Sequence, residues 1–180
     1  MAIDRRDFLG AAAVGAISVS DARAASAPPM PEYQRLDATA LAAEIRRGRI
    51  TPIEALDAAI ARVEATGVIN AIAERDFEQA RELAKSLSAS GRAERESRAR
   101  AAPLMGVPFA LKDLGVAMKG TVTTNGCAFF RDAVQDHDST LVQRHRAAGL
   151  NIFAKTTTPE FGQTATTESR LFGLTRNPWH

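Results

Sequence analysis

Cysteine is nearly absent from this sequence, with Cys127 as the single residue of its type among 180. One cysteine cannot form an intrachain disulfide, so a stable fold must depend on its packed core, even in an oxidising compartment. Cys127 lies between Gly126 and Ala128-Phe129-Phe130. This setting favours a small buried apolar role over nucleophilic chemistry, because no cysteine–histidine pair is apparent.

An excess of one charge is also missing. The 23 Lys and Arg residues nearly balance the 21 Asp and Glu residues, which leaves a formal net charge of +2. That charge is too small to favour a nucleic-acid partner, so none is expected. The most densely charged stretch, residues 92–100, contains arginines and glutamates but no aromatic side chain on which a base could stack. We expect this stretch to be a solvated linker.

Signals for two common kinds of catalytic site are missing or weak. The sequence has no Gly-x-Ser-x-Gly nucleophile elbow, and Ser139 and Ser169 lack flanking glycines. One metal-site candidate is His137, between Asp136 and Asp138. Asp138 has a plainer role as the cap of a helix that starts at Ser139. We therefore expect no metal site.

Long hydrophobic runs are missing too, and the apolar stretch over residues 8–19 is shorter than the roughly 20 residues that span a bilayer. Arg5-Arg6 precedes this stretch, and Ala22-Arg23-Ala24 follows it as a cleavage site. This order predicts a twin-arginine signal peptide over residues 1–24 and an extended linker over 25–35, with chance pairing of the arginines as the alternative. The implied partner is the twin-arginine export machinery. The implied location is periplasmic or secreted, without a stable membrane anchor.

Local motifs predict helices in the next part of the chain. Asp37 is placed to cap a helix that Gly48 ends, and Thr51-Pro52-Ile53-Glu54 is a capping box with proline at the first helical position. A short strand is expected at residues 70–73 and a third helix at 77–87. From Pro103 the pattern changes to strand, loop, helix and strand, which predicts an α/β fold.

The segment Gly106-Val107-Pro108-Phe109-Ala110-Leu111-Lys112-Asp113 carries the most informative residue of the chain. As a strand, it places Lys112 on the face of Pro108 and Ala110, where apolar surroundings favour a neutral amine that can act as a base. The alternative is a lysine whose ammonium group reaches water from an apolar stem. Asp113 falls on the opposite face and is expected to accept loop N–H groups. Lys155 ends another apolar run and is expected to be a solvated strand end.

This segment resembles the lysine motif of the amidase signature family. Further matching segments follow in the family's order: the Thr-rich stretch 121–126, the helix and strand of 138–156, Pro159-Glu160-Phe161-Gly162, and Phe172 to Trp179. The resemblance covers residues 36–180, which we assign to the N-terminal part of an amidase domain. It implies a mixed sheet covered by helices, with additional N-terminal helices.

The resemblance also implies chemistry. In the family, a Ser-cisSer-Lys triad hydrolyses amides without a cofactor, and Lys112 falls on the position of the catalytic lysine. Both serines of that triad belong to family segments that follow the Asn-Pro-Trp motif and are missing here. We therefore expect a truncated copy of a longer enzyme, inactive by itself.

Three functions are considered for the parent protein. The first is an amidohydrolase that cleaves the carboxamide bond of a small substrate. The second is a non-catalytic fragment or binding protein with the amidase fold. The third is a relative of the amidotransferase subunit that amidates Glu-tRNA, which expected export disfavours because tRNA and ATP are cytoplasmic. The sequence indicates neither the substrate nor the oligomeric state.

Overall fold

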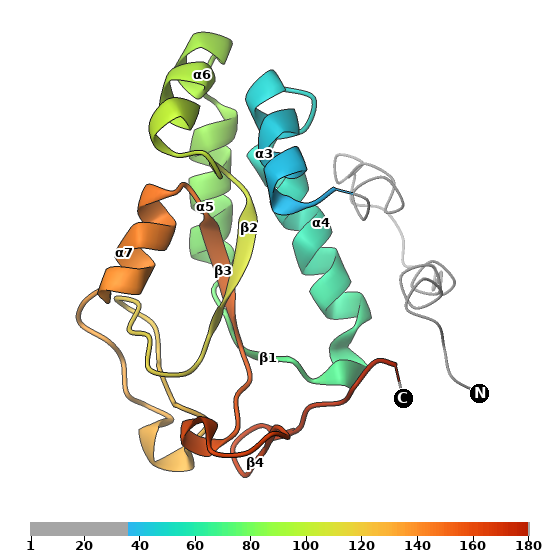
Figure 1. The fold of residues 1–180 in the computed structure, drawn as a ribbon, viewed down its shortest axis with the longest axis vertical. Coiled ribbons are helices and arrows are strands. Elements are labelled where there is room, and N and C mark those ends of the chain that lie inside the picture. Colours follow the sequence, from blue (N-terminus) through green and yellow to red (C-terminus); the bar gives the residue numbers. More distant parts are fainter. Residues whose placement is uncertain (1–35, 180) are drawn as a thin grey trace.

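A computed structural model describes residues 36–179 (Figure 1). The signal peptide and linker predicted for residues 1–35 lie outside the described range. The described helices are α3 (Ala38–Arg47), α4 (Pro52–Ala65), α5 (Phe77–Ser88), α6 (Arg92–Ala101) and α7 (Thr140–Ala147). The strands are β1 (Ile72–Arg75), β2 (Pro108–Lys112), β3 (Asn151–Thr156), β4 (Glu168–Ser169) and β5 (Gly173–Leu174). Among these residues, no helix is long and apolar enough to cross a membrane.

The main sheet has three strands in the order β1-β3-β2, so the last strand in sequence lies in the middle. β3 runs parallel to β2 and antiparallel to β1, while β4 and β5 form a separate antiparallel pair. This mixed sheet with flanking helices confirms the predicted α/β class. Helices pack on both faces of the central strand β3, and Lys155 on this strand is buried.

Two apolar clusters join the helices to the sheet. On one face, Leu56 and Ile60 of α4 and Ala84 of α5 pack with Phe153 of β3. On the other face, Val142 of α7 packs with Leu111 and Ile152. Ala110 belongs to the first cluster and Phe109 to the second, as strand alternation predicts. The sheet is thus the middle layer, with α4 and α5 on one side and α7 on the other.

The predicted helix signals are confirmed. The Asp37 side chain accepts the N–H of Ala40, and Gly48 ends α3 in a left-handed conformation with φ 74°. Thr51 and Glu54 form the reciprocal capping box of α4, with Pro52 in its first turn. These local motifs fix where the two helices begin. The apolar face of α4 then packs on the sheet, whereas that of α3 packs with Leu87, Met105 and Val107.

The region around β1 differs slightly from the prediction. The strand lies at Ile72–Arg75, two residues later than the expected 70–73. Asn70 takes a left-handed conformation with φ 56° and ends a 3-10 turn, Gly67–Ile69, so it cannot begin an extended strand. The third helix, expected over 77–87, is confirmed as α5.

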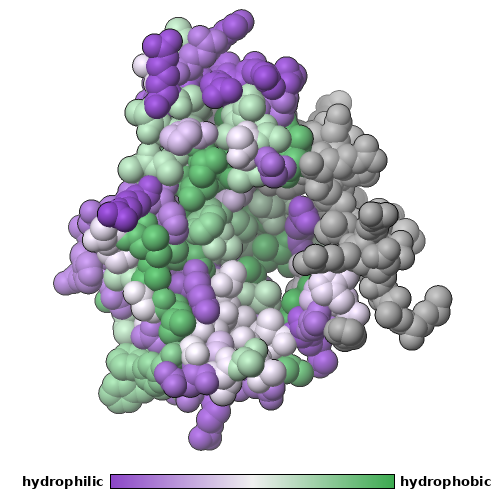
Figure 2. Space-filling view, in the orientation of Figure 1, coloured by the Kyte–Doolittle hydropathy of each residue, from purple (hydrophilic) through white to green (hydrophobic). Residues whose placement is uncertain are grey.

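The linker predicted at residues 92–100 is wrong because this stretch forms helix α6, whereas the predicted solvation of the stretch is confirmed. Two ion pairs at i,i+4 spacing support it, Arg92–Glu96 at 2.9 Å and Glu94–Arg98 at 2.7 Å. None of its residues is buried, and the end of the molecule that it forms is predominantly hydrophilic (Figure 2). The prediction relied on missing apolar periodicity, whereas side-chain pairing supports this helix.

Candidate active site

Lys112 is the last residue of β2 and pairs with Thr156 of β3 in the sheet register. Lys112 is exposed, whereas the neighbouring Leu111 is buried. The apolar enclosure expected for Lys112 is therefore not provided by residues 36–179. The reason is its position at the end of the strand, on the face opposite to the Leu111 cluster. No hydrogen bond joins Lys112 to a serine within the described range.

Asp113 follows directly and is buried, with 1% of its surface exposed. Its Oδ1 atom accepts the backbone N–H of Thr124 at 2.9 Å, and its Oδ2 atom accepts the Thr124 hydroxyl. The Asp113 N–H in turn donates to the Thr156 carbonyl at 3.1 Å. These contacts confirm the predicted role of Asp113 as an acceptor for loop N–H groups. They also fix the backbone on the C-terminal side of Lys112.

Lys155 is the buried lysine of the sheet, with 1% of its surface exposed. Its Nζ donates to the Val122 carbonyl and, at 3.0 Å, to the Thr123 hydroxyl. Glu74 Oε2 lies 3.7 Å from Nζ. Burial lowers the pKa of Lys155, and the nearby Glu74 and Asp113 carboxylates partly oppose that effect.

The prediction of a solvated strand end at Lys155 is therefore wrong. The residue belongs to the central strand, paired with Leu111 of β2 on one side and Glu74 of β1 on the other. That position follows from the strand order, which the sequence does not display. One signal was available, since Lys155 directly follows the apolar run Ile152-Phe153-Ala154 of a strand buried on both faces.

The Thr-rich segment 121–126 lies against the ends of β2 and β3. Glu74 Oε1 accepts the Val122 N–H at 3.2 Å, and Asn125 Oδ1 accepts the Gly115 N–H at 2.7 Å. Gly126 has φ 71°, and a Cβ atom there would lie 2.5 Å from the Thr158 carbonyl oxygen. The segment thus requires glycine where it passes the exit of β3.

The serines considered in the sequence have structural positions. Ser169 is buried, and its hydroxyl accepts the Phe172 N–H at 3.1 Å. Ser139 is the N-cap residue of α7 but makes no side-chain capping bond. Neither combines an exposed hydroxyl with a lysine partner among the described contacts.

The predicted capping of α7 by Asp138 is wrong. Asp138 Oδ1 accepts the Lys119 N–H at 2.8 Å, and Oδ2 lies 3.0 Å from Arg146 Nε. Asp138 thus ties Lys119, which precedes the Thr-rich segment, to α7 while Ser139 takes the N-cap position. His137 Nδ1 contacts Asp136 Oδ1 at 2.7 Å. Within residues 36–179, no group of three or more His, Cys, Asp or Glu side chains is arranged to hold a metal ion.

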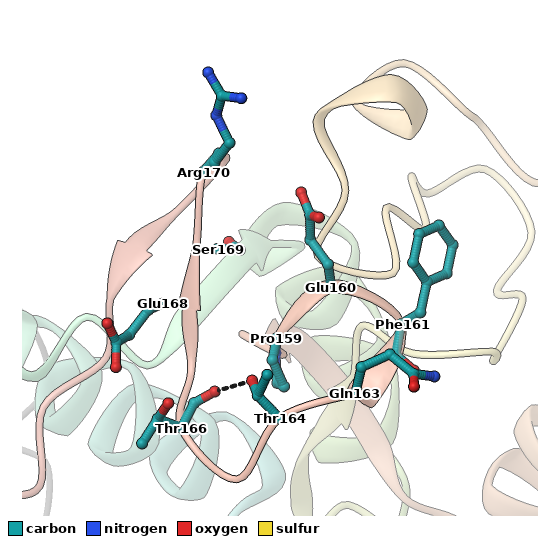
Figure 3. Close-up of a pocket in the computed structure, with 9 residues that line it drawn as sticks. All are labelled: Pro159, Glu160, Phe161, Gln163, Thr164, Thr166, Glu168, Ser169 and Arg170. Carbon is teal, nitrogen blue, oxygen red and sulfur yellow. Dashed lines mark hydrogen bonds between the residues drawn. The ribbon is translucent and has the colours of Figure 1, made fainter.

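An open hollow of about 460 Å³ lies beyond β3, on the segment that leads to the β4–β5 pair (Figure 3). Its lining comes entirely from residues 159–170. The Glu160 and Arg170 side chains project outward in this view, and the Thr164 hydroxyl donates to the Thr166 carbonyl at 2.7 Å. Pro159 both lines the hollow and lies against Gly126, so the Thr-rich segment and this surface are neighbours.

The profile of the amidase family matches residues 54–180. The chain belongs to the amidase family. This match includes the strand that carries Lys112, the Thr-rich segment and β3. The predicted resemblance to amidase signature enzymes is confirmed.

Individual relatives agree with this assignment. The amidase chain is 42% identical over 147 residues to a 6-aminohexanoate-cyclic-dimer hydrolase of Paenarthrobacter ureafaciens, covering 80% of this chain and 27% of the relative. It is 35% identical over 151 residues to the A subunit of a glutamyl-tRNA(Gln) amidotransferase of Renibacterium salmoninarum, covering 83% and 28%.

A solved structure of a 6-aminohexanoate cyclic dimer hydrolase complexed with substrate superposes with a TM-score of 0.68 at 40% identity. That match covers 81% of this chain and 28% of the other. The amidase signature fold is thus confirmed for the region compared. The chain spans under a third of the length of these relatives.

Proposed function

We propose that the whole protein is an amidohydrolase that cleaves the carboxamide bond of a small substrate. The observation that carries this proposal is the amidase-family match over residues 54–180, which includes Lys112 at the end of β2. The anchored Asp113 beside Lys112 supports it, because a catalytic base needs a fixed backbone.

The proposed mechanism assigns Lys112 as the base of a Ser-cisSer-Lys triad. Neutral Lys112 takes a proton from the bridging serine, which takes one from the nucleophilic serine as it attacks the amide carbonyl. The relay reverses to protonate the leaving amine, and water then hydrolyses the acyl-enzyme. Both serines, and the cover that would desolvate Lys112, are assigned to segments present in the longer relatives and not in residues 1–180.

The first substrate to test is the 6-aminohexanoate cyclic dimer, because the 42% identical relative is named for its hydrolysis. Purified full-length protein, as its gene encodes it, is incubated with this dimer and with simple aliphatic and aromatic carboxamides. The proposal predicts opening of the cyclic dimer to a linear product with a new amine and a new carboxylate, and release of amine or ammonia from the simple carboxamides, without added metal or cofactor. Failure to hydrolyse any of these amides would favour the non-catalytic binding-protein alternative.

The second candidate function is that of an amidotransferase component, which the 35% identical relative favours. The same assay separates the two functions. An amidohydrolase transfers the acyl group to water in the absence of partner proteins, whereas activity that depends on partner proteins, ATP and tRNA would support the amidotransferase. Predicted twin-arginine export remains a proposal, and it supports the hydrolase because ATP and tRNA are cytoplasmic.

A further inference from the structure

Three charged side chains, on or directly after the three strands of the main sheet, form hydrogen bonds with residues 122–124. β1 provides Glu74, β3 provides Lys155, and Asp113 follows the last residue of β2. In the ribbon view the chain leaves β2 at the lower end of the sheet and returns near the exit of β3 (Figure 1). The Thr-rich segment is therefore held by residues that are distant from one another in sequence.

The Val122 residue is held from both sides. Glu74 Oε1 accepts its N–H at 3.2 Å, and Lys155 Nζ donates to its carbonyl. Lys155 also donates to the Thr123 hydroxyl, which donates onward to the Val116 carbonyl at 3.1 Å. Buried Lys155 and partly exposed Glu74 together thus satisfy the backbone of Val122 and orient the next side chain.

The following residue continues the connection toward Lys112. Thr124 gives both its N–H and its hydroxyl to the Asp113 carboxylate. Asp113 is adjacent to Lys112 in sequence, and its own N–H is fixed on Thr156. A displacement of residues 122–124 would therefore move the carboxylate that holds the chain beside Lys112.

We infer that Lys155, paired with Glu74, is a positioning residue that holds residues 122–124 against Asp113 and thereby fixes Lys112. This inference rests on the proposed function for the role of Lys112. It adds a second lysine, which acts through the loop and does not touch the reacting atoms. Lys155 and Glu74 together are called the loop clamp below.

The stability of the core alone does not explain why Lys155 and Glu74 are charged residues rather than apolar ones. Buried ion pairs are often replaced by apolar side chains of similar size without loss of stability, whereas loss of one partner leaves an uncompensated charge. The hydrogen bonds to Val122 and Thr123 are specific to the loop clamp. They are what an apolar replacement of Lys155 would remove.

The test uses Lys155→Met/Glu74→Gln in the full-length protein. Methionine keeps an unbranched apolar chain, and glutamine keeps a carbonyl oxygen for the Val122 N–H, so no buried charge of the pair is left alone. The control is Lys85→Met/Glu82→Gln, which removes an exposed ion pair of 2.8 Å on α5. Hydrogen exchange and amide hydrolysis are measured for both variants.

The inference predicts at least tenfold faster exchange of the Thr124 amide, which donates to Asp113, in the clamp variant. The Asn151 amide, bonded to the Val107 carbonyl at 2.8 Å, should be unchanged. It also predicts a kcat at least tenfold lower with KM within threefold of the wild type. The control variant should match the wild type in both measurements.

Unchanged exchange of the Thr124 amide would overturn the inference, and so would faster exchange with an unchanged kcat. Failure of the proposed function looks different. In that case the wild type hydrolyses no amide, or Lys112→Ala remains active, while the exchange comparison still decides whether the clamp holds the loop.

Discussion

At the scale of single residues, the two lysines at the sheet end have exchanged the environments expected of them. Lys112 is exposed within the described range, and Lys155 is buried on the central strand. The motif that identifies Lys112 is therefore not a burial signal. It marks a place in the chain, at the end of β2 and beside an anchored aspartate. Burial depends on what packs over that place.

Burial of Lys155 predicts a pH-dependent stability. Because its pKa is lowered in the folded state, the unfolded chain binds more protons between that lowered value and the ordinary 10.5. The free energy of unfolding of the wild type, relative to Lys155→Met, should therefore rise with pH across this window. The slope should be at most about 1.4 kcal/mol per pH unit.

Urea denaturation of both proteins at several alkaline pH values measures this difference. The variant serves as the control for other groups that titrate in the same range. A difference that stays constant or falls as pH rises would contradict the assigned burial of Lys155.

At the scale of elements, two glycines between β2 and α7 have similar φ angles but different surroundings. Gly126 and Gly115 have φ of 71° and 63°. A Cβ atom at Gly126 would collide with the Thr158 carbonyl, whereas at Gly115 nothing lies within 4 Å. Comparing alanine substitutions at these two glycines therefore distinguishes the energetic cost of backbone strain from the cost of a steric clash.

We predict that Gly115→Ala costs about 1 kcal/mol, from left-handed strain alone. Gly126→Ala should cost at least about 2 kcal/mol more, because the loop must also move away from the exit of β3. Equilibrium urea unfolding of the two variants gives the comparison. Equal losses would show that Gly126 has no tight contact with Thr158.

The sequence predicted those elements whose signals are local. Asp37, Thr51 and Glu54 act within one helical turn, so the starts of α3 and α4 could be read from neighbouring residues. Helix α6 was missed because its support comes from charged pairs rather than an apolar face. The cap assigned to Asp138 was wrong because that carboxylate is used by Lys119 and Arg146, which the fold brings close.

In the candidate site too, contacts set by nearby residues were predicted and contacts set by the strand order were missed. Asp113 was predicted correctly because strand alternation and the adjacent loop decide its contacts. Glu74 and the burial of Lys155 were missed because they depend on β3 lying between β1 and β2. That order is a long-range property, and no spacing within a single strand reveals it.

At the scale of the whole molecule, the family is established, while export and catalysis are proposals about the whole protein. Arg5 and Arg6 precede an apolar stretch in the order of a twin-arginine signal. We predict that Arg5→Lys/Arg6→Lys causes full-length protein to accumulate in the cytoplasm of a twin-arginine-competent bacterium, where the unaltered protein is exported.

Cell fractionation followed by immunoblotting measures the distribution. Arg46→Lys/Arg47→Lys provides a matched control, because it alters a second adjacent arginine pair on the exposed end of α3. Unchanged export of the Arg5→Lys/Arg6→Lys variant would contradict the assigned signal.

Lys112, at the end of β2, is proposed as the catalytic base that residues 36–179 supply. The most direct test of this proposal is amide hydrolysis by full-length Lys112→Ala, with Lys85→Ala as an exposed control and circular dichroism to verify folding. We predict that Lys112→Ala is folded and loses at least about 1,000-fold in kcat, while Lys85→Ala retains the wild-type rate. A folded Lys112→Ala variant that hydrolyses the substrate near the wild-type rate would contradict the assignment of Lys112 as the base.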